Sequence, residues 1–212
     1  MIQVDPEPSQ RARPVHPEHS RREPGRRVEE TAQSWREANA QFCQVVGDKV
    51  KLNLHSKQNA IWQSPKRFLV FLAGYQAGKS CLLAHWLKRE IDRTYNPKDE
   101  FNDYLVGTPS YPLLEKKLLK EFQIVFEKIH KLGAYKTGVK RIEFYNSNIR
   151  IHFGSADNPE SLESATVKGI VLDEVGQNQF PKASWDAVLG RASIHQARIL
   201  CATTLYNWGW LK

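Results

Sequence analysis

The chain has 212 residues, of which 41% are hydrophobic and 10% aromatic, enough for one domain with a real core. Its first residues carry acids and prolines, and its longest apolar run, FLVFLA, is too short to cross a bilayer, so we expect neither a signal peptide nor a membrane span. The net charge is +8, and three cysteines without paired spacing indicate neither a disulfide framework nor a zinc site.

The first 40 residues have the composition of a disordered tail. They hold seven Arg, seven Asp or Glu and five of the eleven prolines, so the whole charge excess lies beyond them. They show no apolar periodicity, which favours disorder, with a loose role on nucleic acid or a partner as the alternative. We therefore place the folded domain at residues 41–212.

From residue 67 onward, strand and helix patterns alternate along the chain. The continuous apolar run 67–73 predicts a strand buried on both faces, and 80–95 follows it with helical spacing. The remaining expected elements are a strand at 103–108, a helix at 111–132, a hairpin at 141–153, a strand at 169–174, a helix at 184–191 and a strand at 198–204. This alternation predicts an α/β layered fold with a mainly parallel sheet.

The segment FLAGYQAGKS, residues 71–80, is similar to a phosphate-binding loop between the first strand and its helix. Backbone N–H groups and the positive helix end at such a turn can hold phosphate oxygens. Lys79 would reach the β and γ phosphates of ATP, and the Ser80 hydroxyl would ligate Mg²⁺. The first glycine comes one position late, because Ala73 precedes Gly74, and a tight turn without a ligand is the alternative. The remaining nucleotide-binding candidates in the loop are Tyr75, Gln76, Ala77 and Gly78.

Two acids follow the apolar strand at 169–172. Ligands of open α/β sheets lie at the carboxyl ends of the strands, where Asp173 and Glu174 are expected. Asp173 would serve the metal ion, and Glu174 would act as general base toward the attacking water. An acidic pair after a strand can also be an ordinary solvated loop. Its place downstream of the lysine loop favours nucleotide hydrolysis.

The strand at 198–204 ends in Thr203 and Thr204, on what should be the neighbouring strand. Hydroxyl groups there could contact the γ-phosphate or its water and report hydrolysis. Two threonines that close a strand are also simply good β formers.

Taken in order, these motifs resemble the ATPase domain of the large terminase subunit of tailed bacteriophages. The hairpin followed by NPESLE, the run LDEVGQ and the threonine pair carry the resemblance, which extends from about Gln58 to the C-terminus. It implies an α/β P-loop NTPase of the additional-strand, catalytic-glutamate type, with helices on both faces of the sheet and a β-hairpin before the acidic strand. It also implies a motor that hydrolyses ATP to drive double-stranded DNA into a procapsid.

The resemblance assigns roles to individual residues. It makes Lys79 and Ser80 the ligands of phosphate and Mg²⁺, Asp173 the metal-site acid, Glu174 the catalytic glutamate, and Thr203 with Thr204 the coupling motif. Gln58 resembles the family's adenine-contacting glutamine, with Gln63 as a second candidate and a solvated helix residue as the alternative for both.

The sequence departs from the family at the arginine finger. Many relatives have arginine where Tyr75 stands, and some have one where Glu163 stands. Arg191 is our substitute, against the simpler interpretation of a surface salt bridge. Leu205 also departs from the family, because a proline often follows the paired threonines there.

Further expectations concern DNA, partners and nuclease activity. The lysines expected on one helix stripe, as DNA contacts or as a solvated face, are Lys117, Lys120, Lys128 and Lys131. The resemblance implies a portal protein, a small terminase subunit and a homo-oligomeric ring as partners, in the host cytoplasm at the procapsid. Only Asp186 follows Glu174 among the acids, so we expect no two-metal nuclease centre in this chain.

Two other classes of function remain open at this point. One is a different nucleic-acid-dependent P-loop ATPase, such as a helicase or a strand-exchange protein, although no specific motif supports it. The other is a non-catalytic DNA-binding or assembly protein with a degenerate loop, which Ala73 and the unassigned finger favour.

Overall fold

The computed structural model describes residues 42–47, 49–74, 77–163, 165–177 and 179–204, all within the compact unit Gln41–Lys212. The predicted tail at 1–40, the loop residues Tyr75 and Gln76, and Leu205 lie outside the described residues. Within the described part, no helix is long and apolar enough to cross a membrane.

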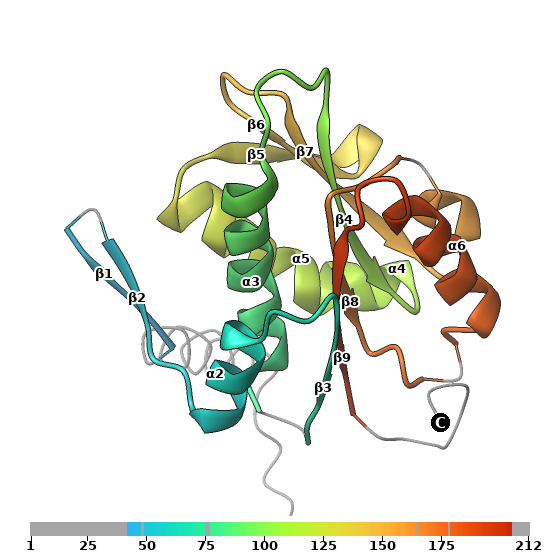
Figure 1. Cartoon of the computed structure of the whole chain (residues 1–212), viewed down its shortest axis with the longest axis horizontal. Coiled ribbons are helices and arrows are strands. Elements are labelled where there is room, and N and C mark those ends of the chain that lie inside the picture. Colours follow the sequence, from blue (N-terminus) through green and yellow to red (C-terminus); the bar gives the residue numbers. More distant parts are fainter. Residues whose placement is uncertain (1–41, 48, 75–76, 164, 178, 205–212) are drawn as a thin grey trace, which may run out of the picture. The chain divides into compact units, whose positions relative to one another are not determined.

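A seven-stranded sheet forms the centre of the domain (Figure 1). Its order is β3-β9-β8-β4-β7-β6-β5, with parallel pairing from β3 to β7 and antiparallel pairing from β7 to β5. The strands are β3 (Phe68–Leu72), β4 (Asn102–Thr108), β5 (Gly133–Lys136), β6 (Arg141–Phe144), β7 (Ile149–Ser155), β8 (Gly169–Asp173) and β9 (Arg198–Thr203). The predicted α/β fold, its mainly parallel sheet and the hairpin β6–β7 are confirmed.

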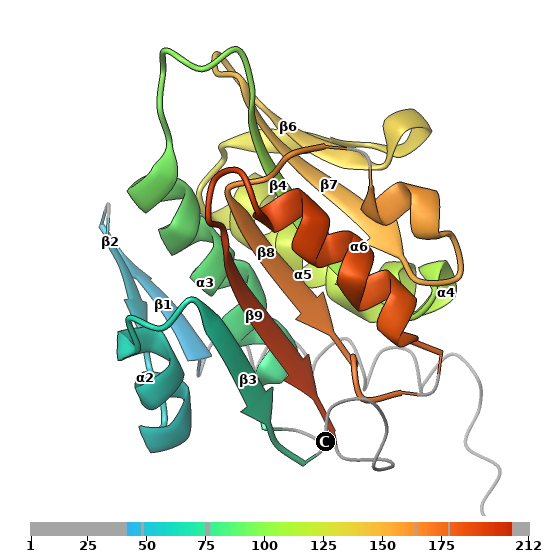
Figure 2. The ribbon, with the colours of Figure 1, turned by 45° about the vertical axis from the view of Figure 1, so that its right-hand side comes forward.

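Helices cover both faces of this sheet (Figure 2). One face carries α3 (Lys79–Thr94) and a helical segment at 111–129, and the other carries α6 (Lys182–Ala192). Alternate residues of the central strands enter the two cores. In β8, for example, Val171 packs with the side chains of α3, whereas Ile170 and Leu172 pack with those of α6. The strand period of two thus explains why the buried strands read as continuous apolar runs.

The predicted helix at 111–132 differs from the structure in its end and its winding. It consists of α4 (Tyr111–Leu113), π-helical turns at Leu114–Leu118, α5 (Leu119–Gln123) and π-helical turns at Ile124–Ile129. Lys131 follows the helix with φ of +50°, and β5 then begins. The spacing of 100° per residue therefore does not hold along this segment, and the lysine stripe that assumed it was wrong in geometry.

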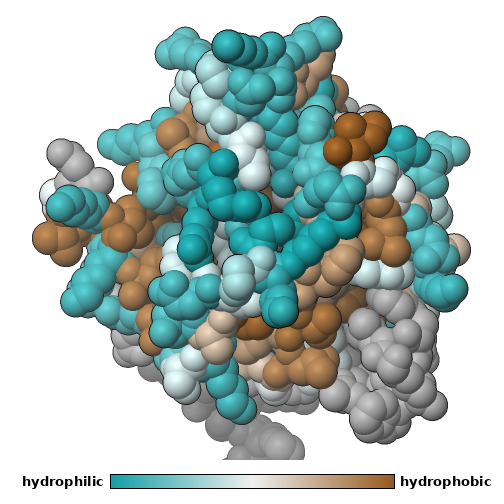
Figure 3. Space-filling model, in the orientation of Figure 1, coloured by the Kyte–Doolittle hydropathy of each residue, from teal (hydrophilic) through white to brown (hydrophobic). Residues whose placement is uncertain are grey.

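The first predicted strand, β3, is not buried on both faces. It lies at the sheet edge and pairs with β9 alone in the described part of the chain. Its exposure alternates, because Phe68, Val70 and Leu72 are 47%, 47% and 50% exposed whereas Leu69 and Phe71 are buried. Figure 3 shows apolar surface in the lower half of this face of the molecule. An apolar run alone cannot distinguish an edge strand from a central one.

Several smaller elements precede or connect these. A two-stranded hairpin, β1 (Cys43–Val46) with β2 (Lys49–Leu52), leads to α2 (Ser56–Gln63), which His55 caps. Short 3₁₀ helices occur at Thr137–Val139 and Pro159–Leu162.

Candidate functional site

The glycine-containing loop joins the end of β3 to the start of α3, as predicted. Gly78 is the N-cap of α3 and has φ of +66°. This left-handed backbone conformation is energetically unfavourable for residues other than glycine. A Cβ atom there would lie 2.5 Å from Nε2 of Gln58. The loop therefore needs glycine at this position. The 16-residue helix behind it directs the backbone N–H groups of its first turn toward the loop, which suits an anion.

Lys79 is a buried cation whose partners are neutral. Its side chain reaches back over the loop, where Nζ donates to the carbonyl oxygens of Ala73 (3.0 Å) and Gly74 (2.8 Å) and to Oγ1 of Thr204 (3.0 Å). The residue is 5% exposed, and no carboxylate within the described residues forms an ion pair with it. Because a buried charge is costly without a counter-charge, this arrangement favours an anionic ligand at the loop.

The acidic pair meets the loop at the carboxyl end of β8. The Ser80 hydroxyl donates to Oδ2 of Asp173 at 3.2 Å, although the two residues are 93 positions apart. A hydroxyl and a carboxylate oxygen at this spacing are ligands that Mg²⁺ takes together with phosphate oxygens. No group of three or more His, Cys, Asp or Glu side chains that could hold a metal occurs in the described residues. The Ser80 hydroxyl and the Asp173 carboxylate are therefore the residues here that could hold a divalent cation.

Burial makes the charge on Asp173 expensive. The side chain is 1% exposed, and burial raises the pKa of Asp173 to about 6, although the nearby Lys117 ammonium opposes the shift. The negative charge of Glu174 contributes to this rise. A bound cation would remove the cost, which agrees with a metal site.

Glu174 has the geometry of a functional residue rather than of a solvated loop. It is 4% exposed and has φ of +57°, a conformation that a residue with a side chain adopts only when its surroundings impose it. Its N–H group donates to the carbonyl of Ala202 at 2.7 Å, and its Oε2 accepts the N–H of Thr204 at 3.4 Å. The solvated alternative for the acidic pair is therefore wrong.

The two threonines lie beside the acids, because β9 is the neighbour of β8 as predicted. Thr203 is fully buried and its Oγ1 accepts the N–H of Gly176 at 2.9 Å. Thr204 contacts both Lys79 and Glu174. The pair thus connects the loop to the acidic strand, and its coupling role stays a prediction.

Gln58 is also part of this site. It is 2% exposed, and its Nε2 donates to the carbonyls of Ala77 (3.4 Å) and Gly78 (3.3 Å). Its Oε1 accepts the N–H of His55 at 3.1 Å. Gln58 is therefore a buried support of the loop, whereas Gln63 is exposed at the end of α2. An adenine contact stays a prediction for both.

Sequence reasoning placed Lys117 among the DNA-contact lysines and gave Glu121 no role, but the structure brings both to this site. Lys117 Nζ lies 3.7 Å from Oε1 of Glu174 and 4.0 Å from Oδ2 of Asp173. Glu121, one turn further along, is 3% exposed and accepts a hydrogen bond from Sγ of Cys81. Burial raises the pKa of Glu121 to about 7. Both residues lie on the helical segment that follows β4, and the pairing of β4 with β8 brings this segment close to the acids.

Comparison with solved structures identifies proteins of the same fold. No family model and no curated protein matches the chain. The large terminase ATPase domain of Thermus phage P74-26 matches 75% of the chain and 68% of its own length, with a TM-score of 0.58 and 20% identity. The large terminase of a second phage, a thermophilic bacteriophage, matches with a TM-score of 0.58 at 15% identity, and that of bacteriophage HK97 with 0.54 at 16%.

The chain has the fold of a phage large terminase ATPase domain. The matches to the second phage's terminase and to the HK97 terminase include 70% and 79% of this chain. The chain spans only 38% and 36% of the length of those two proteins. The second phage's terminase has also been solved in complex with ADP and with ATP-gamma-S.

In this terminase fold, the other predicted residues lie outside the cluster of loop, acids and threonines. Arg191 Nη2 is 3.5 Å from Oε2 of Glu163, and both side chains are partly exposed. Two of the three positions considered for an arginine finger, Glu163 and Arg191, are therefore each other's partners. Exposed positions are also found for Lys120, Lys128 and Lys131.

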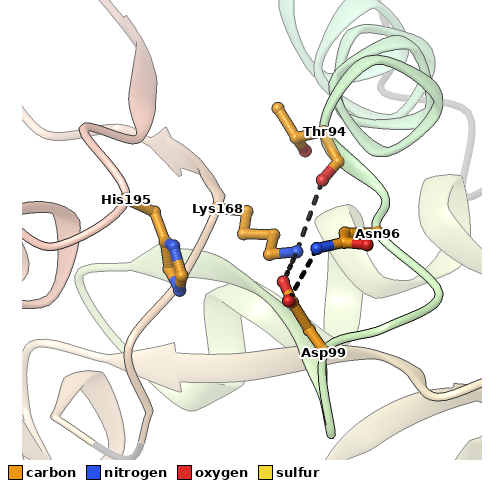
Figure 4. A pocket seen from close by; sticks show the side chains of 5 residues that line it. All are labelled: Thr94, Asn96, Asp99, Lys168 and His195. Atoms are coloured by element: carbon orange, nitrogen blue, oxygen red, sulfur yellow. Dashed lines mark hydrogen bonds and ion pairs between the residues drawn. The ribbon is translucent and has the colours of Figure 1, made fainter.

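A polar pocket lies at the other end of the sheet, near the amino ends of β4, β8 and β9 (Figure 4). It is lined by Thr94, Asn96, Asp99, Lys168 and His195. Lys168 Nζ donates to Oδ2 of Asp99 and to Oδ1 of Asn102, both at 2.5 Å. Its charge is therefore paired with a carboxylate, in contrast to that of Lys79, whose hydrogen-bond partners are all neutral.

Proposed function

We propose that this chain binds ATP with Mg²⁺ at the carboxyl edge of the sheet and hydrolyses it. The observation that carries the proposal is the buried ammonium of Lys79, which has only neutral partners and lies beside the Ser80–Asp173 oxygen pair. An anion with a divalent metal would satisfy both features together. The complexes of the thermophilic bacteriophage terminase with ADP and ATP-gamma-S support a nucleotide as that anion.

Different residues of the site would have different roles in hydrolysis. The N-terminus of α3 and Lys79 bind the phosphates, and Ser80 with Asp173 holds the metal. Bound Mg²⁺ would neutralise charge that develops on the phosphate oxygens. Glu174, held by its backbone and by the Thr204 N–H, orients the attacking water and takes its proton.

We further propose that hydrolysis powers translocation of double-stranded viral DNA into a procapsid. The fold shared with the phage terminase ATPase domains and the threonine link between Lys79 and Glu174 support this role. DNA contact through exposed lysines, a ring of subunits, a portal protein and a small terminase subunit belong to the same proposal.

The test compares ATP turnover by the wild-type chain, Glu174→Gln and Lys79→Ala, with and without duplex DNA. Glu174→Gln should bind ATP but hydrolyse it at least about 10²-fold more slowly. Lys79→Ala should lose nucleotide binding, while Lys57→Ala, an exposed lysine of α2, should behave as the wild type.

Unchanged turnover in Glu174→Gln would refute its assignment as the base. Nucleotide binding without any wild-type turnover would favour a non-catalytic assembly protein instead.

A further inference from the structure

Lys117 provides the positive charge that the two buried acids require. Asp173 and Glu174 are 1% and 4% exposed, and neighbouring carboxylates in so dry a place repel each other. Among the described residues, Lys117 is the only side chain that forms an ion pair with either acid, and it reaches both. Lys79, the other cation of the site, is directed to neutral oxygens instead.

Lys117 and a metal ion would use the same oxygen atom. Lys117 Nζ lies 4.0 Å from Oδ2 of Asp173, and this Oδ2 also accepts the hydrogen bond of Ser80. A Mg²⁺ ion between Ser80 and Asp173 would therefore bring a second positive charge to an oxygen that Lys117 already serves. Lys117 and the metal ion would then compete for the same carboxylate oxygen, which disfavours the presence of both there.

Lys117 can retreat because of where it is anchored. It lies in the π-helical turns Leu114–Leu118, and its side chain is 42% exposed although its ammonium group faces the acids. A lysine stem of four carbons lets the ammonium move into water without a change in the backbone. Departure of Lys117 would also release Oε1 of Glu174, the oxygen opposite the one held by Thr204.

We propose that Lys117 is a placeholder cation that neutralises Asp173 and Glu174 before ligand binding and is displaced when metal and nucleotide bind. The inference rests on the proposed nucleotide site and adds a regulator to it. Lys117 acts through Asp173 and Glu174, so it is a positioning residue. Its removal should raise the affinity of the site for a metal ion. It should also make the protein dependent on metal for part of its stability.

The experiment measures Mn²⁺ binding by electron paramagnetic resonance, with the full chain saturated with ADP. Lys117→Met should bind Mn²⁺ about three- to tenfold more tightly than the wild type, because partly exposed ion pairs of this kind contribute little individually and two are removed. Lys116→Met removes the neighbouring exposed lysine and should match the wild type. Lys117→Arg keeps the charge and should also stay close to the wild type.

Thermal unfolding gives a second readout that does not depend on activity. In EDTA, Lys117→Met should unfold at a lower temperature than Lys116→Met, because two buried carboxylates then lack a cation. With Mg²⁺ and ADP the difference should disappear.

Two results would overturn the proposal that Lys117 is a placeholder cation. Wild-type binding of Mn²⁺ with ADP, together with unchanged or weaker binding by Lys117→Met, would refute the placeholder and leave the proposed nucleotide site intact. Absence of any Mn²⁺ and ADP binding by the wild type would overturn the nucleotide site and the placeholder together.

Discussion

Substitution of Gly78 by alanine should destabilise the chain through two separable effects. The first is the left-handed φ of +66°, which costs alanine about 1–2 kcal/mol relative to glycine. The second is a contact of 2.5 Å between the new Cβ and Nε2 of Gln58, which forces the buried amide to move. That movement gives up two long hydrogen bonds, to Ala77 and Gly78, worth about 0.5 kcal/mol each. The expected total is about 2–3 kcal/mol.

Urea unfolding of a double-mutant cycle measures the two effects. In a Gln58→Ala background the clash no longer exists, so Gly78→Ala should cost only the backbone part, about 1–2 kcal/mol. The coupling free energy between the two positions should be about 1 kcal/mol. Gly74→Ala is the matched control, because nothing lies within 4 Å of a Cβ atom there, and it should change stability by less than about 1 kcal/mol. An equal cost of Gly78→Ala in both backgrounds would show that Gln58 does not press on the loop.

Further expectations concern pH and DNA. Because burial raises the pKa of Glu121 from 4.5 to about 7, its contribution to stability is present below pH 4.5 and lost as the pH rises to about 7. In urea unfolding, the free energy of unfolding of Glu121→Gln should therefore rise relative to that of the wild type by about 1.4 kcal/mol per pH unit over that window. A difference between the two proteins that does not change with pH would refute the pKa shift. Burial lowers the pKa of His85 from 6.5 to about 4, so stability is lost as the pH falls through this range, and His85→Gln should abolish that loss. Neutralising Lys120 and Lys128 should lower the salt slope of duplex DNA binding by about 2, whereas an unchanged slope would indicate a solvated surface.

The local sequence pattern was sufficient to predict those features that depend on a single short segment of the chain. The positions of Lys79 and Ser80 at a helix start, and of Asp173 and Glu174 after a strand, follow from residue type and spacing within about ten residues. The alternation of strand and helix patterns also predicted the layered α/β fold, whereas helices on both faces of the sheet were implied by the family resemblance. These parts of the fold and site could be predicted from the sequence.

Strand order decided what local pattern could not. The apolar run of β3 is compatible with a central or an edge position, and its alternating exposure arises because β9, not β3, lies next to β8. Likewise, the residues around Lys117 are those of a solvated helix face. Lys117 reaches the acids because β4 pairs with β8, which directs the turns after β4 toward Asp173. Contacts between segments tens of residues apart depend on packing energies summed over the whole core, and no single stretch of sequence contains them.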